Sequence, residues 1–478
     1  MTGTDLLAVL PELILAVGAM ALLLAGVILG EKSARSISWG AIGLLLLCGI
    51  AVLFWTPDQA QAFGGAFVVD GFARFAKVLI LAASGFSIIL AEEFFAGSSL
   101  SRFEMSVLIL LASLGMLLMV SAGSLVALYL GMELQSLALY VLAAFNRDQL
   151  RSTEAGLKYF VLGALASGMM LYGISLIYGF TGTVSFGRIA QVVTQSGMTI
   201  GLIFGIVFLI SGLAFKVSAV PFHMWTPDVY EGAPTPITAY IATASKVAAM
   251  ALFLRTILTA FPHALADWRQ IIVAISVLSM ALGAVGALGQ KNIKRLMGYS
   301  SIGHMGYMLL GLAAGTALGA RGVLIYLAIY VFTYLGVFAA IQAMRRGGQQ
   351  VEAIADLAGL GRTDPRLALV FSLLFLSLAG IPPLAGFFGK FYVFLAAIQA
   401  GLIWPAVLGV LASVIGLVYY LLLVKQMYFE EPVAAFDHDL AAGSRTILVI
   451  AGAVVLFFIV AASPVVSSAD AAARALLP

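Results

Sequence analysis

Apolar stretches about 20 residues long, separated by short polar connections, recur along the whole 478-residue chain. A stretch of that length crosses a lipid bilayer as one helix, so the pattern predicts an all-α polytopic membrane protein. The boundary between Ala122 and Gly123 decides the number of spans, because residues 105–146 are almost continuously apolar. About 14 spans are expected, near residues 6–29, 37–56, 72–91, 105–121, 123–146, 155–180, 199–225, 235–261, 270–289, 295–315, 322–344, 365–399, 402–428 and 446–463.

The seventh span is interrupted at a charged residue. Within residues 212–238, Lys216 lies inside the apolar run, Pro221 then breaks the helix, and a polar, proline-rich turn follows. A broken helix at membrane depth is tolerated only where protein or a hydrated cavity surrounds it. These residues are therefore expected to form the centre of an ion path.

The twelfth span, residues 365–399, repeats this composition. It is far longer than a straight crossing needs, and Gly-Ile-Pro-Pro at residues 380–383 interrupts it before Lys390. Matching broken helices in two halves of a chain indicate an internally repeated transporter. We expect two inverted five-helix repeats, each with its fourth helix broken. The expected division is 1–104 for the first three helices, 105–261 for the first repeat, 262–428 for the second repeat, and 429–478 for the last helix and C-terminus.

Basic residues gather on alternate connections, which the positive-inside rule places in the cytoplasm. With fourteen spans, both termini then lie on the opposite side. The longest connections are residues 182–197 and 347–366, and the second is expected to contain a short surface helix. The basic residues on the odd-numbered connections are Lys32, Arg35, Arg102, Arg147, Arg151, Lys291, Lys294, Arg295, Arg345, Arg346, Arg362, Arg366 and Arg445.

Composition excludes several classes of protein. The chain is 62% hydrophobic and 10% charged, whereas soluble domains are about 25% charged. Its net charge of +3 gives no reason to expect a nucleic-acid partner. One cysteine, Cys48, cannot ligate an iron–sulfur cluster or form an internal disulfide. The chain has no phosphate-binding loop or dinucleotide fingerprint, and residues 6–29 are expected to be a retained first span.

Ionisable residues lie near the middle of further spans: Glu133, Lys246 and His304. A charge at membrane depth costs roughly 2.5–3.5 kcal/mol even on lenient scales, so such residues usually face protein or water and serve a pathway. Burial disfavours a charged lysine and a nearby carboxylate favours it. A lysine between these effects, as we expect of Lys216 beside Glu133, can take up and release a proton when its partner moves.

Structural roles are the alternatives. Lys246 or His304 alone could be a helix–helix contact, and Lys158 could extend to the membrane surface. The hydroxyls along the eleventh span, Tyr326, Tyr330 and Thr333, could serve packing rather than the path. Arg74, Lys77 and Lys425 are expected to mark membrane interfaces. Asp228 and Glu231 are expected near the cytoplasmic surface, capping the next helix rather than collecting protons.

Three segments resemble a known family. They are KVSAVPFHMWTPDVYEGAPTPITAYIATASKVA, NIKRLMGYSSIGHMGYMLLG and GIPPLAGFFGKFYVF. They resemble the proton-pumping antiporter-like subunits of respiratory complex I, a superfamily that also includes cation/proton antiporter complexes and membrane-bound hydrogenases. The resemblance covers nearly the whole chain. It implies a location in the bacterial inner membrane, where the basic connections lead us to expect both termini on the periplasmic side.

The resemblance implies roles for individual residues. Glu133 matches the family's central glutamate, which modulates the lysine of the seventh span, here Lys216. Lys246 matches the connecting basic residue, and Lys390 matches the terminal lysine of the exit half-channel. His304 matches a histidine on the central polar axis. Lys158 matches a family lysine near the quinone-proximal side.

Two differences separate the subunits of this family. One sister subunit has a glutamate where this chain has Lys390, and another is longer and ends in a lateral amphipathic helix. This chain stops at Pro478, soon after its last span. Both differences favour the antiporter-like subunit that the stretches LPELILAVGAMALLL, STEAGLKYFVLGALASGMMLYGISLIYGFTG and DVYEGAPTPITAY resemble.

The leading hypothesis is a proton-translocating subunit of an NADH–quinone oxidoreductase. The resemblance implies no cofactor in this chain, with flavin, iron–sulfur clusters and quinone in partner subunits. The implied partners are another antiporter-like subunit, the small subunits toward the quinone site, and membrane lipids. Two alternatives remain open: a cation/proton antiporter subunit without redox partners, and a scaffold that transmits conformational change without moving protons.

Overall fold

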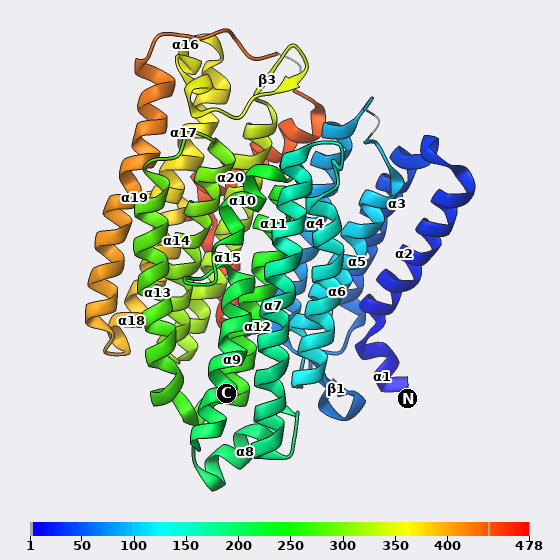
Figure 1. Ribbon diagram of the computed structural model, residues 1–478, viewed down its shortest axis with the longest axis vertical. Coiled ribbons are helices and arrows are strands. Elements are labelled where there is room, and N and C mark those ends of the chain that lie inside the picture. The colour runs from blue at the N-terminus through cyan, green and yellow to red at the C-terminus, as the bar shows by residue number, and fades with distance from the viewer. Residues whose placement is uncertain (1–2, 99, 438–439, 478) are drawn as a thin grey trace.

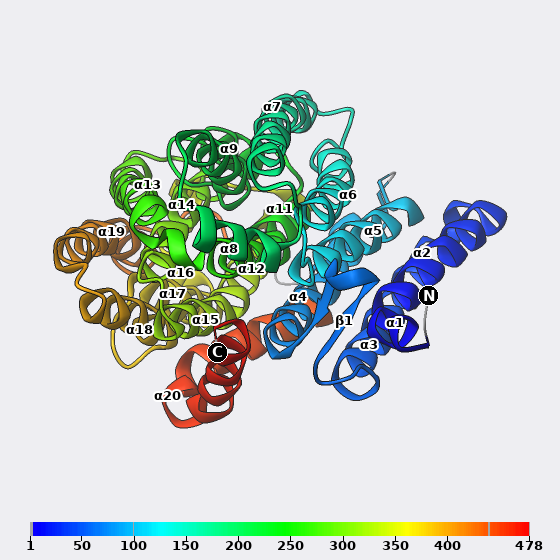
Figure 2. The same ribbon diagram turned by 90° about the horizontal axis from the view of Figure 1, so that it is seen from below.

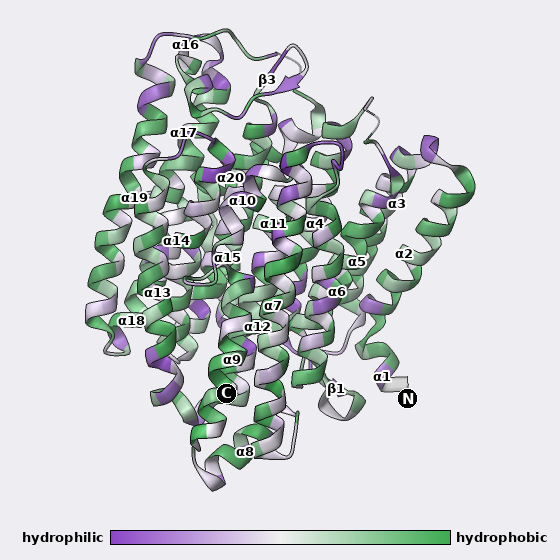
Figure 3. Cartoon of the chain, in the orientation of Figure 1, coloured by the Kyte–Doolittle hydropathy of each residue, from purple (hydrophilic) through white to green (hydrophobic). Residues whose placement is uncertain are grey.

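A computed structural model describes residues 3–98, 100–437 and 440–477. Within these residues, twelve helices are long and apolar enough, by length and composition, to cross a membrane. The chain is therefore a multi-pass membrane protein made almost entirely of helices (Figure 1). Apolar residues cover most of the helical surface, and polar residues gather at the end that carries β3 and α16 (Figure 3).

The element bounds follow the predicted spans closely. Three broken segments contribute helix pairs, and two short antiparallel hairpins lie in connections. The helices are α1 (Gly3–Ala8), α2 (Leu10–Leu29), α3 (Ala34–Ile50), α4 (Gly71–Phe95), α5 (Phe103–Val120), α6 (Leu125–Ala143), α7 (Leu150–Thr181), α8 (Phe186–Ser196), α9 (Ile200–Val217), α10 (Trp225–Gly232), α11 (Thr235–Ala242), α12 (Ala244–Ala260), α13 (Leu265–Ala287), α14 (Ile293–Ala313), α15 (Ala317–Gln342), α16 (Leu360–Thr363), α17 (Pro365–Ala379), α18 (Ala385–Gln399), α19 (Ile403–Phe429) and α20 (Ala442–Leu476). The strands are β1 (Ala60–Ala62) paired with β2 (Phe67–Val69), and β3 (Arg345–Arg346) paired with β4 (Gln349–Gln350).

The predicted boundary between Ala122 and Gly123 is confirmed, since α5 ends at Val120 and α6 begins at Leu125. The turn is held by a hydrogen bond from the Gly123 amide to the Ala66 carbonyl at 2.9 Å. A Cβ at Gly123 would lie 2.1 Å from the Gly65 carbonyl oxygen, so only glycine fits here. The close approach of two backbones is what separates these two spans.

Both predicted helix breaks are confirmed, at the connection from α9 to α10 and at the connection from α17 to α18. A third break was missed. The predicted span 235–261 is divided at Thr243, which has φ −115° and ψ −79° and separates α11 from α12. The Thr243 hydroxyl donates to the Ala239 carbonyl at 2.6 Å. The break has no proline or glycine, the residues that usually mark such an interruption in a sequence, so it could not be predicted.

The polar centre of the molecule is surrounded by apolar helices. Seen from below (Figure 2), α7, α9, α13, α19 and α18 follow one another around the edge, with α12 and α14 inside them. The spanning windows of α11–α12 and α15 are almost completely buried, while α2, α19 and α20 are largely exposed. A helix that is buried all round can carry polar residues that no lipid-facing helix could carry.

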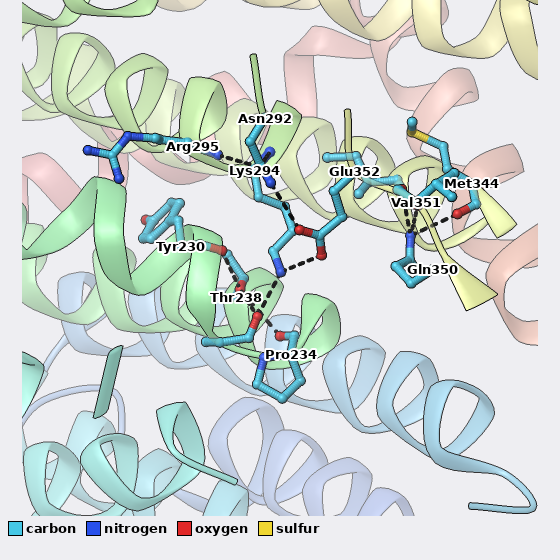
Figure 4. Close-up of polar contacts among 12 residues, drawn as sticks. Tyr230, Pro234, Thr238, Asn292, Lys294, Arg295, Met344, Gln350, Val351 and Glu352 are labelled. Atoms are coloured by element: carbon cyan, nitrogen blue, oxygen red, sulfur yellow. Dashed lines mark hydrogen bonds and ion pairs between the residues drawn. The ribbon is translucent and has the colours of Figure 1, made fainter. Parts of the chain in front are cut away.

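The connection after α15 forms the short surface helix that was predicted, as α16, preceded by the β3–β4 hairpin. Its middle pairs with the start of α14: the Ile293 amide donates to the Glu352 carbonyl at 2.9 Å. Lys294 then donates to the Glu352 carboxylate and to the Ala233 carbonyl at the end of α10, both at 2.8 Å (Figure 4). This contact fastens the α15–α17 connection to the broken seventh span. The other long connection contains α8, which was not predicted.

Two buried ion pairs hold the N-terminal helices. Lys77 was expected to mark a membrane interface, and that expectation was wrong. Its side chain is only 3% exposed and pairs with Glu12 on α2 at 2.6 Å. Arg255, near the end of α12, donates two hydrogen bonds to the Asp70 carboxylate, at 2.7 and 2.9 Å. Removing one partner from a buried pair leaves an uncompensated charge, so these pairs fix the packing of α2, α4 and α12.

Candidate functional site

The seventh span ends abruptly at Val217, because Ser218 adopts the left-handed conformation with φ 64° and ψ 34°. A residue other than glycine costs roughly 1–2 kcal/mol in that conformation. A helix end leaves its last carbonyls without intrahelical partners. Here the Trp225 ring nitrogen donates to the Phe215 carbonyl at 3.0 Å. The break therefore exposes backbone oxygens inside the protein and surrounds them with side-chain donors.

Lys246 binds another backbone carbonyl at the end of α9, that of Lys216. Its Nζ donates to the backbone oxygen of Lys216 at 3.1 Å and to the hydroxyl of Ser218, and it lies 4.6 Å from the centre of the Trp225 ring. The side chain is completely buried. The C-terminal end of a helix carries partial negative charge, which favours a cation. Lys246 is thus bound to the broken end of α9.

Lys216 points the other way, into α6 and α7. Its Nζ donates to the hydroxyls of Ser136 at 2.6 Å and Tyr140 at 3.4 Å. It also lies over the rings of Tyr140, Tyr159 and Phe215, at 5.4, 5.8 and 5.6 Å from their centres. The side chain is 3% exposed. Hydroxyl and aromatic groups can hold an ammonium without neutralising it.

Glu133 lies on the same face of α6, three residues before Ser136, but it is not bound to Lys216 directly. It accepts a hydrogen bond from Ser167 on α7. Ser136 donates to the Met132 carbonyl at 2.5 Å, so its lone pairs are free to accept from Lys216. Glu133 and Lys216 are therefore bound to different hydroxyls, those of Ser167 and Ser136.

Lys390 has the same relation to the second break as Lys246 has to the first. The last helical residue of α17 is Ala379, and its carbonyl accepts from Lys390 Nζ at 2.8 Å. The Ser413 hydroxyl on α19 accepts from the same nitrogen at 2.8 Å, and the Tyr307 ring lies 5.0 Å away. Gly380, with φ 87°, lies directly beneath the lysine side chain.

A cavity of about 470 Å³ opens at Lys390. It is lined by Gly380 and Ser413 and, further out, by apolar side chains of α18 and α19. Phe391 and Ile398 on its rim are 44% and 52% exposed. Lys390 therefore lies at the inner end of a space that opens on the flank of the molecule.

His304 is the centre of a hydroxyl cluster. Its Nδ1 and Nε2 lie 2.8 Å from the Tyr326 hydroxyl and 3.2 Å from the Tyr420 hydroxyl. Ser300, one turn earlier on α14, lies 2.6 Å from Tyr420 and 2.7 Å from Tyr334. Every member can both donate and accept, or alternate between the two, which is the property that a proton relay requires.

A second string of hydroxyls runs beside this cluster. Ser301 lies 3.0 Å from the Tyr330 hydroxyl and 3.3 Å from the Tyr230 hydroxyl of α10. Thr333, expected as a possible member, instead donates to the carbonyl of Ile329 on its own helix at 2.7 Å. Of the three hydroxyls predicted along the eleventh span, the two tyrosines are therefore in the polar network and the threonine is not.

The central residues form three groups rather than one continuous chain. Glu133, Lys216 and Lys246 make the first group, the hydroxyls around His304 the second, and Lys390 the third. The Tyr307 ring faces both His304, at 6.1 Å between ring centres, and Lys390. Between Lys246 and the His304 group, the hydrogen bonds of the described residues leave a gap.

Lys158 belongs to a different place. Its side chain is 41% exposed and pairs with Glu154 and Asp228, both at 2.7 Å. Arg295 completes the cluster by pairing with Asp228 at 2.5 Å and with Glu231 at 3.1 Å. The expectation that Asp228 and Glu231 cap the next helix was wrong, since α11 has no side-chain cap. They hold basic side chains of α7 and α14 instead.

At Asp228, the ion pairs together lower the pKa of the carboxyl by more than burial raises it. Partial burial acts to raise the pKa of its carboxyl, but the hydrogen bonds from Lys158 and Arg295 hold that pKa below its ordinary value. Asp228 therefore stays ionised at neutral pH and is a fixed anchor rather than a proton collector. A cavity of about 180 Å³ lies against this cluster.

Several of these residues could not have been selected from the sequence. Ser136, Ser218 and Ser413 bind the three lysines, yet serines in apolar spans commonly bond to their own helix and carry no distinctive spacing. Tyr420 is likewise one aromatic residue among many in α19. Among the described residues, no group of three or more His, Cys, Asp or Glu side chains is arranged to hold a metal ion.

The fold and this row of buried lysines define a class of membrane transporter subunit. The family described as NADH:quinone oxidoreductase/Mrp antiporter, transmembrane, matches residues 122–416, so the chain belongs to that family. The match spans both broken helices and every lysine of the central row.

Individual relatives are close in length and sequence. NADH-quinone oxidoreductase subunit N of Parvibaculum lavamentivorans is 58% identical over 477 residues, covering 100% of this chain and 99% of that protein. The subunit N of Rhodobacter capsulatus is 51% identical over 478 residues and covers 100% of both chains.

Two solved structures contain chains that superpose on this one along almost its whole length. A chain of respiratory complex I from Thermus thermophilus superposes with a TM-score of 0.83 at 34% identity, covering 96% of this chain and 99% of that one. A chain of the Mrp complex from Dietzia sp. superposes with a TM-score of 0.87 at 22% identity, covering 100% and 98%, which shows a common fold.

Proposed function

We propose that this chain is the N subunit of a bacterial NADH:quinone oxidoreductase and translocates protons in the membrane arm of that enzyme. The observation that carries the proposal is the pairing of buried lysines with broken helices: Lys246 on the end of α9 and Lys390 on the end of α17. The relatives named as subunit N support the choice of complex. The enzyme is a translocase, and its flavin, iron–sulfur clusters and quinone belong to partner subunits.

Proton transfer starts between Lys216 on α9 and Lys246 on α12. The Lys246 ammonium binds the backbone carbonyl of Lys216, while the Lys216 ammonium points toward α6 and α7. Like charges in a buried, poorly hydrated site repel strongly. Protonation of Lys216 therefore favours release from Lys246, and the reverse. A shift of Glu133 toward Lys216 would reverse the preference, because a carboxylate stabilises the charged lysine.

The proton released by Lys246 passes along hydroxyls and the imidazole of His304. Tyr230, Ser301 and Tyr330 lie on one side of this route, and Tyr326, Ser300 and Tyr420 lie around the histidine. The gap before them must be crossed by water or by side-chain movement. Lys390 then receives the proton and passes it to the cavity on the flank of α18 and α19.

The arrangement of the repeats is part of the proposal. The helices α5 to α12 would form one unit and α13 to α19 the other, matching the divisions 105–261 and 262–428, and each has its fourth span broken. The basic connections support a cytoplasmic location for β3 and α16, with both termini at the periplasmic side of the inner membrane. Lys158, Asp228 and Arg295 then lie at the cytoplasmic end.

Partner subunits would flank the row at both ends. Glu133 and Ser167 lie on α6 and α7, toward the small subunits that lead to the quinone site, and the Lys390 cavity faces another antiporter-like subunit, subunit M. A cation/proton antiporter would use the same lysines without a redox partner, and a scaffold would not use them at all. The experiment must separate these cases.

The decisive experiment compares two driving forces in membrane vesicles that contain the chain. We expect proton uptake on addition of NADH and quinone, abolished by a quinone-site inhibitor. Sodium-dependent proton exchange in vesicles without NADH would instead support the antiporter. The neighbouring genes provide an inexpensive check, since those of an oxidoreductase favour the first result and antiporter genes favour the second.

Ser218 offers a matched pair of substitutions at the first break. Ser218→Gly and Ser218→Ala both remove the hydroxyl that binds Lys246, and only glycine relieves the left-handed backbone. We expect both variants to lose pumping to the same extent. The alanine variant should be less stable than the glycine variant by about 1 kcal/mol, since glycine carries no penalty at φ 64°. Wild-type pumping by Ser218→Gly would show that the hydroxyl has no part in the path.

A further inference from the structure

A slot of about 700 Å³ lies between α5, α6 and α7, outside the lysine row. Polar residues line one end of it, where these helices meet their connections: Arg102, Glu104, Arg147, Asp148 and Thr153. Apolar residues line the remainder, deeper along the helices: Leu108, Leu137, Tyr140, Val141, Leu157 and Phe160. The slot therefore has a charged mouth at the membrane surface and apolar walls toward the membrane interior.

The two arginines at the mouth have no side-chain partner among the described residues. Other arginines at the same end of the molecule are paired, such as Arg295 with Asp228 and Arg346 with Asp356. In the described part of the chain, Arg102 and Arg147 form no ion pair and donate no side-chain hydrogen bond. Two unpaired guanidiniums at one mouth are suited to bind a phosphate, which accepts bidentate hydrogen bonds.

A carboxylate completes the mouth. Glu104 lies in the first turn of α5, and its Oε2 is buried without a hydrogen-bond partner. A buried carboxylate oxygen that lacks a donor is costly, and it requires a cation or donor nearby. The mouth thus offers two guanidiniums and two carboxylates, Glu104 and Asp148, and this balance of charge complements a zwitterion better than a simple anion.

The walls are suited to hydrocarbon. Leu137, Val141, Leu157 and Phe160 are 57%, 54%, 61% and 49% exposed, although they lie in membrane-spanning helices. Along α6 they extend from the mouth over about two helical turns, or about 10 Å at 1.5 Å per residue. The volume falls within the roughly 300–1,000 Å³ of ordinary ligand sites.

We propose that this slot binds one phosphatidylethanolamine molecule from the cytoplasmic leaflet. Its phosphate lies between Arg102 and Arg147, its ammonium binds the free oxygen of Glu104, and its acyl chains fill the groove along α6 and α7. Tyr140 forms part of the inner wall and lies 3.4 Å from Lys216 Nζ. The bound lipid therefore excludes water from the outer side of the Lys216 chamber, beside the small subunits that flank α6 and α7.

The test is to determine the structure of the whole complex in nanodiscs made of a single phospholipid, by cryo-electron microscopy. In phosphatidylethanolamine we expect elongated density in the slot, with its head group between the arginines. The double variant Arg102→Gln/Arg147→Gln should lower occupancy at least about tenfold. The variant Val141→Trp should displace the chains by filling the groove. The matched control Lys32→Gln/Lys291→Gln removes two unpaired charges from the same end and should leave the density unchanged.

Head-group recognition is tested by Glu104→Gln and by a second lipid. Wild-type complex should hold phosphatidylethanolamine in preference to phosphatidylglycerol, and Glu104→Gln should remove that preference. The proposal is overturned by an empty slot in the wild type, by a neighbouring subunit's side chains filling it, or by density that persists when both arginines are replaced. Equal occupancy by both lipids in the wild type would overturn the role of Glu104. None of these measurements depends on proton pumping.

Discussion

Replacing Lys216 with alanine is expected to reduce NADH-driven proton pumping at least about tenfold, while the complex stays assembled. The reason is local. The Lys216 ammonium binds the hydroxyls of Ser136 and Tyr140 on one side, and its backbone carbonyl holds Lys246 on the other. Alanine removes the first contact and preserves the second, so Lys246 stays in place without a partner to exchange protons with. Proton uptake by inverted membrane vesicles on addition of NADH measures the effect.

Lys425→Ala is the control for this experiment. Lys425 is a lysine of the long helix α19, but its side chain is exposed rather than buried. Its replacement should leave pumping unchanged. Intact subunit composition in both variants would show that the loss at Lys216 is not a failure of assembly. Wild-type pumping by Lys216→Ala would remove the basis of the proposed path.

Moving Lys390 should be almost as damaging as removing it. In Gly380→Ala, the new Cβ would lie 3.0 Å from Lys390 Cδ and 3.3 Å from its Nζ, at a backbone position with φ 87°. The lysine side chain must then shift by a few tenths of an ångström, which disturbs its hydrogen bonds to the Ala379 carbonyl and the Ser413 hydroxyl. We expect pumping to fall several-fold in Gly380→Ala and at least about tenfold in Lys390→Ala. Both are measured as for Lys216.

Gly401→Ala separates the lysine contact from backbone strain. Gly401 has a similar backbone, with φ 79°, but a Cβ there would meet no atom within 4 Å. Alanine at either glycine introduces comparable strain, and only the one at residue 380 presses on a lysine. Equal pumping by the two variants would mean that the position of Lys390 is unimportant.

Two of the helix breaks could be predicted from the sequence because proline or glycine residues lie at them. Pro221 and the Gly-Ile-Pro-Pro run at 380–383 lie where the structure interrupts the seventh and twelfth spans. The break at Thr243 gives no such signal, since its hydroxyl bonds to its own helix. Lysines inside apolar spans were equally visible. What they bind was not, because a carbonyl at a helix end becomes available only when the helix is broken and another helix is packed against it.

Charges near span ends were the least predictable. Lys77 and Asp228 looked like surface residues by position along their spans. Lys77 is buried because Glu12, far away in sequence, neutralises it. Asp228 is tied to Lys158 and Arg295 from two other helices. The position of a residue in its span indicates its depth in the membrane. Whether its charge is paired depends on contacts with helices that are distant in the sequence.

Three lysines of the protein bind the end of a helix in the same way. Lys246, Lys294 and Lys390 each donate to a carbonyl at the end of a helix, namely those of Lys216, Ala233 and Ala379. Lys294 is also paired with Glu352, so its charge is fixed. Lys246 and Lys390 have no carboxylate bound to them in the described residues. They are held by dipoles alone, and a proton can leave them without breaking an ion pair.

The central claim is that protons cross the membrane arm through these lysines. Its most direct test is the ratio of protons pumped to electrons transferred in proteoliposomes that contain the complex with Lys216→Ala and Lys390→Ala together. We expect this ratio to fall, or NADH oxidation and pumping to fall together because the blocked path holds back the coupled reaction. An unchanged ratio at an unchanged rate of NADH oxidation would contradict it and would make the chain a scaffold.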